Sequence, residues 1–136
     1  MHNQLDVKDY LMGIASIDEQ HAKLLEMINL LSDGMAMGDA RPVLESLIER
    51  LYAFAQSHFA YEEELMERTG YPNLEAHRTE HRAYLTRLTE LLHRWAEGGG
   101  FMIAVDVHDL ITLWATEHII ESDHSYATHL KQHGIT

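Results

Sequence analysis

Four long stretches of the sequence carry apolar residues every three or four positions, the spacing that turns one face of an α-helix toward a core. Glycine and proline cluster between these stretches, most clearly at Gly70-Tyr71-Pro72-Asn73 and Gly98-Gly99-Gly100. No sustained apolar/polar alternation predicts a strand. The expected helices cover residues 18–37, 41–69, 74–96 and 101–118. Because short connections between long helices make antiparallel neighbours, we predict an all-α, up-down-up-down four-helix bundle.

The ends of the stretches carry helix signals. Ser16 and Glu19 have the spacing of a capping box at the start of the first helix. Asp39 and Pro42 suit the first turn of the second helix. With 136 residues the chain is expected to form a single domain, with an N-terminal arm over about 1–16 and a polar C-terminal tail over about 121–136 that holds one or two helical turns.

Charge and composition exclude several classes of function. Lys and Arg number 10 against 22 for Asp and Glu, so the net charge of −12 argues against nucleic acid or an anionic membrane as the partner. The sequence has no cysteine, which excludes disulfides, thiolate metal sites and cysteine nucleophiles. Without a long apolar run, or a signal-peptide pattern over residues 1–9, we expect a cytoplasmic protein.

The inward-facing side of every expected helix is interrupted by histidine. The polar residues in these apolar positions are His21, His58, Glu62, His77, His81 and His118. An ionised glutamate buried without a partner costs several kcal/mol, and each buried imidazole needs a partner for its acceptor nitrogen. No lysine or arginine lies on these faces to neutralise Glu62. A bound metal cation satisfies the carboxylate and the imidazoles together.

The spacing of these residues agrees with a shared site. His58 and Glu62 are four apart, as are His77 and His81, so each pair lies one turn apart on one helix face. His118 and Asp123 are five apart, which leaves them roughly 140° apart on a regular α-helix. If Asp123 joins the site, the helix must end or bulge around residues 119–122. The alternative is that Asp123 only caps the polar tail.

Five imidazoles and two carboxylates are too many donors for one ion, and imidazole suits iron, copper, zinc or nickel. Two six-coordinate ions offer twelve positions. Five imidazoles, two bridging carboxylates and one bridging oxygen atom fill eleven of them. The donor set therefore predicts a two-metal centre with one position left for a small exogenous ligand.

The chain resembles the hemerythrin family in its bacterial single-domain or sensor-domain form. The matching motifs run from about Gly13 to Tyr126: Ile17-Asp18-Glu19-Gln20-His21, His58-Phe59-Ala60-Tyr61-Glu62-Glu63 with Met66, Gly70-Tyr71-Pro72 before His77-x-x-x-His81, and Trp114 before His118-Ile119, Asp123 and Tyr126. The resemblance implies two irons (Fe2+/Fe3+) with an oxo or hydroxo bridge. It implies that His77, His81 and His118 hold one iron, that His21 and His58 hold the other, and that Glu62 and Asp123 bridge them.

By the same resemblance the function is reversible dioxygen binding rather than catalysis, as an oxygen carrier or store, or as the sensing domain of a larger signalling protein. Trp114 and Ile119, close to a ligand, are expected to wall the oxygen pocket. Two alternatives stay open: a ferritin-like di-iron oxidase or peroxidase, and a metal-binding sensory module without oxygen carriage. The first is disfavoured because such sites use two Glu-x-x-His motifs that face the core, whereas Glu121-x-x-His124 lies at the wrong end of the bundle and its histidine is interpreted as solvated.

The remaining conspicuous polar residues are interpreted as solvated. They are His2, Glu63, Glu64, His93, His108, His124, His129 and His133.

Overall fold

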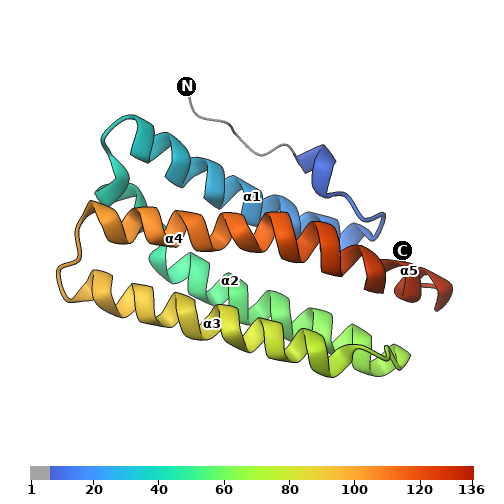
Figure 1. The fold of residues 1–136 in the computed structure, drawn as a ribbon. Coiled ribbons are helices and arrows are strands. Elements are labelled where there is room, and N and C mark those ends of the chain that lie inside the picture. The colour runs from blue at the N-terminus through green and yellow to red at the C-terminus, as the bar shows by residue number, and fades with distance from the viewer. Residues whose placement is uncertain (1–6) are drawn as a thin grey trace.

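Four antiparallel helices make up the bundle (Figure 1). The computed structural model describes the backbone of residues 7–136, and the side chains along it other than those of Val7, Asp9 and residues 120–124. The bundle helices are α1 (Ala15–Ala36), α2 (Ala40–Thr69), α3 (Leu74–Ala96) and a fourth made of α4 (Phe101–Leu113), the π-helix η2 (Trp114–Asp123) and α5 (His124–Gln132). Over the described residues no strand forms. The predicted four-helix fold is confirmed.

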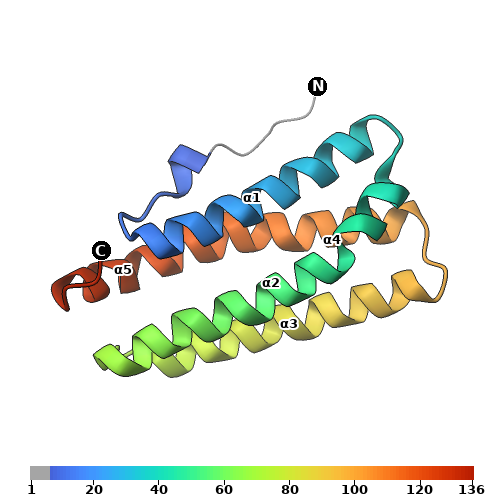
Figure 2. The same cartoon turned by 180° about the vertical axis from the view of Figure 1, so that it is seen from behind.

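The four bundle helices pack around one core. Seen from both sides, α1 lies along α4 and its continuation, while α2 lies along α3 (Figures 1 and 2). Further contacts join α1 to α2 and α3 to α4, and α2 also contacts α4 and α5 across the core. A short 3-10 helix, η1 (Val7–Tyr10), precedes α1 and contacts both α1 and η2. Tyr10, Met12 and Ile14 of this arm are buried, so the arm is part of the packed structure.

The start of α1 differs from the predicted capping box. The helix begins at Ala15, before Ser16, and Ile14 occupies the N-cap position without a side-chain hydrogen bond. Asp18 instead ties the preceding loop to the helix, since its carboxylate accepts hydrogen bonds from the backbone N–H groups of Met12 at 2.7 Å and Gly13 at 3.1 Å. Ser16 Oγ accepts a hydrogen bond from the Tyr61 hydroxyl at 2.6 Å. The capping-box prediction was therefore wrong, because Ser16 is committed to a partner on α2.

The fourth bundle helix is longer than the sequence suggested. Its helical backbone continues without interruption from Phe101 to Gln132, past the expected end near His118. Among the described side chains of α5, Tyr126, Ala127 and Leu130 are buried. The polar tail thus contributes to the core, because its few apolar residues fall on one face of the helix.

The core changes character along the bundle. On α2, Leu44, Leu47 and Leu51 pack against leucines of the neighbouring helices at the end near the α1–α2 connection. His58 and Glu62 follow, both buried, and Leu65 restores the apolar face. Each buried leucine contributes roughly 1.5–3 kcal/mol. The apolar layers on either side therefore allow the fold to hold a polar layer in its interior.

Candidate metal centre

Six of the seven predicted ligand residues meet in this polar layer, and all six side chains are buried. They form two groups. His77, His81 and His118 make the three-histidine cluster, and His21 and His58 with Glu62 make the two-histidine cluster. Within each group the candidate ligand atoms lie within 4.8 Å of one another. All four bundle helices contribute, because His21 comes from α1, His58 from α2, the pair at 77 and 81 from α3, and His118 from η2.

Glu62 lies between the two clusters. Its Oε1 atom is 3.3 Å from His58 Nε2 and 3.4 Å from His81 Nε2, one imidazole from each cluster. Its Oε2 atom is 3.9 Å from His21 Nε2 and accepts a hydrogen bond from the Tyr126 hydroxyl. No hydrogen bond of good geometry reaches Oε1 from the residues that the structure describes. A buried carboxylate oxygen aimed between two groups of imidazoles is suited to bridge two cations.

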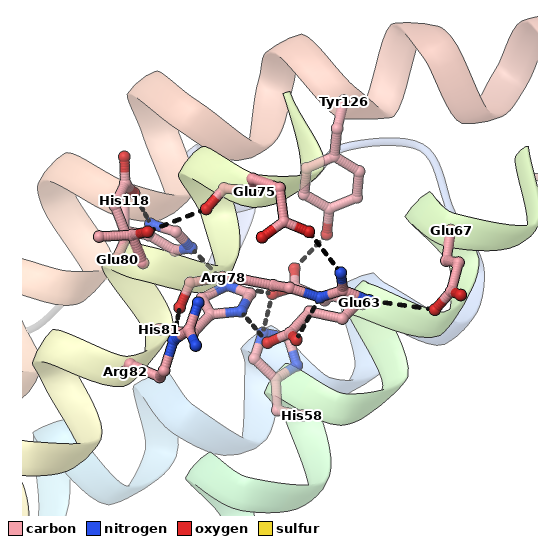
Figure 3. Close-up of polar contacts among 12 residues, drawn as sticks. His58, Glu63, Glu67, Glu75, Arg78, Glu80, His81, Arg82, His118 and Tyr126 are labelled. Carbon is pink, nitrogen blue, oxygen red and sulfur yellow. Dashed lines mark hydrogen bonds and ion pairs between the residues drawn. The ribbon is translucent and has the colours of Figure 1, made fainter. Parts of the chain in front are cut away.

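The outer nitrogens of three histidines are held by acceptors. His58 Nδ1–H donates to Gln20 Oε1 at 2.6 Å. His81 Nδ1–H donates to Glu63 Oε2 at 2.8 Å, and His118 Nδ1–H donates to Glu80 Oε2 at 2.7 Å (Figure 3). A proton on Nδ1 leaves the Nε2 lone pair of each neutral ring facing the interior. This tautomer is the one that binds a metal through Nε2.

The inner nitrogens of His81 and His118 are only 3.2 Å apart. With both Nδ1 atoms donating to carboxylates, two Nε2 lone pairs point at each other. A second proton or a metal cation between them relieves this repulsion. The donor set as a whole is nitrogen-rich with one carboxylate, which fits a first-row transition metal and is unlike the all-oxygen sites of Mg2+ or Ca2+.

Burial and neighbouring charges set the protonation of the cluster. Burial lowers the pKa of His58 to about 4, and the nearby imidazoles of His21 and His81 add to the effect against the opposing charge of Glu62. Burial and His118 lower the pKa of His77 to about 4. Burial alone would raise the pKa of Glu62, but His58, His81 and His21 outweigh it and hold that pKa well below its usual range. At neutral pH, His58 and His77 are neutral and Glu62 is ionised, as metal ligation requires.

A second layer of charge surrounds the three-histidine cluster. Arg78 on α3 contacts Glu63 at 3.3 Å, Glu67 at 3.0 Å and Glu75 at 2.6 Å, so one guanidinium is shared by three carboxylates (Figure 3). Glu63 joins this network to His81 through its second oxygen. Its side chain is only 25% exposed. The interpretation of Glu63 as a solvated residue was therefore wrong.

Gln20, Glu63 and Glu80 were missed because each looks like an ordinary surface residue in its own helix. One signal was present: each stands next to a ligand in the sequence, beside His21, Glu62 and His81 respectively. The structure shows that each serves a ligand on the next bundle helix. Gln20 of α1 supports His58 of α2, Glu63 of α2 supports His81 of α3, and Glu80 of α3 supports His118.

The π-helix η2 carries His118 and ends at Asp123. Its i→i+5 hydrogen bonds widen the turn, which brings positions 118 and 123 closer to one face of the helix than an α-helix would. A bulge was expected around residues 119–122, and the observed widening extends over Trp114–Asp123. The Asp123 side chain lies outside the described residues, so its predicted bridging role stays a prediction. π-Helices are rare in proteins overall, and those that occur are often found at functional sites.

Aromatic side chains close the inner side of the clusters. Phe59 stacks on the His81 ring with centroids 3.9 Å apart and an angle of 8° between the planes. Trp114 lies with its ring centroid 5.7 Å from that of His58 and 4.6 Å from that of Phe59. Trp114 and Ile119, predicted as pocket walls, are both buried.

Of the remaining histidines interpreted as solvated, three with described side chains have defined partners, and one of them is His133, whose Nδ1 lies 2.9 Å from the His129 carbonyl oxygen. His108 is bonded to Ser32 Oγ at 2.6 Å, and His129 Nε2 lies 3.0 Å from the Thr69 carbonyl. His93 and His133 are exposed. His2 and the His124 side chain lie outside the described residues.

Comparison with known proteins decides the family. The sequence profile described as "Hemerythrin HHE cation binding domain" matches residues 12–130. The chain belongs to the hemerythrin family. A bacteriohemerythrin of Stenotrophomonas maltophilia (strain R551-3) is 34% identical over 125 residues, covering 92% of this chain and 80% of that protein. A bacteriohemerythrin of Pseudomonas paraeruginosa (strain DSM 24068 / PA7) is 36% identical over 118 residues, covering 87% of this chain and 75% of that protein.

Solved structures support the fold independently. A crystal structure of a hemerythrin mutant superposes with a TM-score of 0.80, covering 94% of this chain and 96% of that chain at 24% identity. The resemblance predicted from the sequence motifs is thus confirmed for the hemerythrin family and its bundle. None of the helices in the described part of the chain has the length and apolar character to cross a membrane.

Proposed function

We propose that this chain binds dioxygen reversibly at a carboxylate-bridged di-iron centre. The observation that carries the proposal is the pair of unequal clusters joined by Glu62: three imidazoles on one side, two on the other, and one carboxylate oxygen within 3.4 Å of an inner nitrogen from each. Two irons at this site would supply the electrons and the open coordination position that reversible dioxygen binding needs.

The proposed ligands follow from this arrangement. His77, His81 and His118 would hold one iron, His21 and His58 would hold the other, and Glu62 would be shared between them. Asp123 is the second proposed bridge, supported by the π-helical backbone that brings position 123 closer to the face of position 118. The side with fewer imidazoles would leave a position free for dioxygen.

The surroundings favour binding over turnover of an organic substrate. Phe59 and Trp114, with Ile119 proposed as a further wall of the oxygen pocket, keep the surroundings of the imidazoles apolar. A small cavity of about 10 Å3 lies on the far side of these aromatic rings, lined by Phe59, Trp114, Tyr84 and other apolar side chains and by none of the six ligands. That volume is close to the need of a single water-sized molecule. An apolar wall also limits the access of water and protons, which slows irreversible oxidation of the centre.

An optical spectrum recorded through an oxygen cycle tests the proposal. Iron-loaded protein is reduced without air, exposed to air, and then freed of oxygen. The expected result is a visible absorption band that appears with air and disappears when oxygen is removed. Irreversible conversion to the diferric state, with turnover of an added reductant, would instead support a di-iron oxidase or peroxidase.

A further inference from the structure

The acceptors outside the imidazoles are not equivalent in charge. On the three-histidine side, His81 and His118 each donate to a carboxylate, Glu63 and Glu80. On the two-histidine side, His58 donates to the neutral amide of Gln20. The distances, 2.6 to 2.8 Å, are alike, so the difference between the two sides is charge rather than geometry.

A carboxylate acceptor changes the ring it holds. It draws the Nδ1 proton toward itself and increases the electron density on Nε2, so the imidazole becomes a stronger ligand. An amide oxygen orients the ring without adding a negative charge. Two of the three rings on one side are strengthened in this way, whereas His58 is only oriented.

Arg78 does not cancel the effect at Glu63. Its guanidinium contacts Glu63, Glu67 and Glu75 together, so the group outside His81 keeps a net negative charge (Figure 3). Burial also preserves the field at Glu63, whose side chain is 25% exposed, whereas that of Glu80 is 45% exposed and more screened by water. Glu63 is therefore expected to have the larger influence of the two.

We propose that these outer residues rank the two metal positions: Glu63 and Glu80 make the three-histidine position the tighter one, and Gln20 keeps the two-histidine position the weaker. This inference rests on the proposed two-metal centre and adds an order of filling to it. Glu63, Glu80 and Gln20 act as positioning residues, since each touches a ligand and not the metal.

Titration of metal-free protein with Co2+ tests the ranking. Ion uptake is monitored by calorimetry and by the visible absorption bands of bound cobalt. The chain as given is expected to take up two ions in two separate steps. Glu63→Gln keeps an acceptor oxygen but removes the charge, and should weaken the first step about tenfold while leaving the second unchanged. Glu80→Gln should act in the same direction with a smaller effect.

The reciprocal variant is Gln20→Glu, which places a negative charge beside His58 on a side chain of the same shape as glutamine. It should strengthen the second step about tenfold and bring the two steps closer together. Glu64→Gln is the matched control, because Glu64 stands next to Glu63 on α2 and is exposed, and both steps should stay in place. Melting of each metal-free variant checks that the bundle is folded.

The outcomes separate the two claims. Two bound ions with steps that do not respond to Glu63→Gln or Gln20→Glu, or that respond equally in both steps, would overturn the ranking alone. Uptake of a single Co2+ would contradict the two-metal centre itself, and the ranking with it.

Discussion

The hydroxyl of Tyr126 orients the buried carboxylate of Glu62. The residue is fully buried on α5, and its hydroxyl donates to Glu62 Oε2. The bond fixes the rotation of the carboxylate, so that the other oxygen points between His58 and His81. The ligand oxygen is thus oriented before any metal is present, which lowers the cost of ordering on binding.

Replacing Tyr126 by Phe should therefore weaken the centre without breaking the fold. Loss of a hydrogen bond to a charged, buried acceptor is expected to lower the free energy of unfolding of the metal-free protein by about 1–3 kcal/mol. Denaturant unfolding measures this, and metal uptake should fall in the same variant. Tyr61→Phe is the control, because it removes a comparable bond to Ser16 away from Glu62. Equal loss of metal uptake in both variants would contradict the role of Tyr126.

At the residue scale, the sequence predicted the candidate metal ligands better than the residues that accept hydrogen bonds from their imidazoles. His21, His58, Glu62, His77 and His81 stood out because each occupies an inward position where an apolar residue is expected. Gln20, Glu63 and Glu80 occupy positions where polar residues are common, and their partners lie on other helices. Only the packing of the bundle reveals such pairs, since helical periodicity describes one helix at a time.

At the scale of single elements, η2 is the least regular part of the fold and the most constrained by the site. The five-residue spacing of His118 and Asp123 predicted a departure from α-helix, and the π-helix provides it. Its extent over Trp114–Asp123 was not predicted, because π-helical hydrogen bonding has no clear signature in one sequence. The capping-box prediction was wrong for a related reason. The sequence suggested a local hydrogen bond for Ser16, but its side chain accepts a hydrogen bond from Tyr61 on another helix.

Deleting Glu117 tests whether the wide turn of η2 is required. Removing one residue allows the segment to return to α-helical spacing and rotates His118 by about 100° relative to α4. We expect the variant to keep its helical circular dichroism and to lose metal from the three-histidine cluster. Glu117→Ala changes the same exposed side chain without a change of register, and should bind metal normally. Full metal content after the deletion would contradict a role for the π-helical register.

At the scale of the whole molecule, the bundle holds a polar layer between apolar layers, and the metal-free protein must tolerate it. His58 and His77 have pKa values of about 4 in the folded state, against an ordinary value of 6.5. The unfolded chain therefore binds more protons than the folded chain between these values. Stability from these groups is present above pH 6.5 and is lost as the pH falls toward 4.

Metal-free protein should accordingly lose stability between about pH 6.5 and pH 4. The loss from His58 alone is on the order of 3 kcal/mol. His81 partly offsets it, because its pKa is raised: burial lowers it, but contacts with Glu62 and Glu63 raise it by more. Denaturant unfolding at a series of pH values measures the net effect. Constant or rising stability toward pH 4 would mean that these imidazoles are not buried as neutral groups.

The central claim is that imidazoles from all four bundle helices converge on two metal ions joined by Glu62. The most direct test is the iron content of protein loaded and washed under anaerobic conditions, compared with that of Glu62→Ala. The account predicts about two irons per chain, and loss of the pair when Glu62 is replaced. One tightly held ion per chain, or two irons that persist without Glu62, would contradict it.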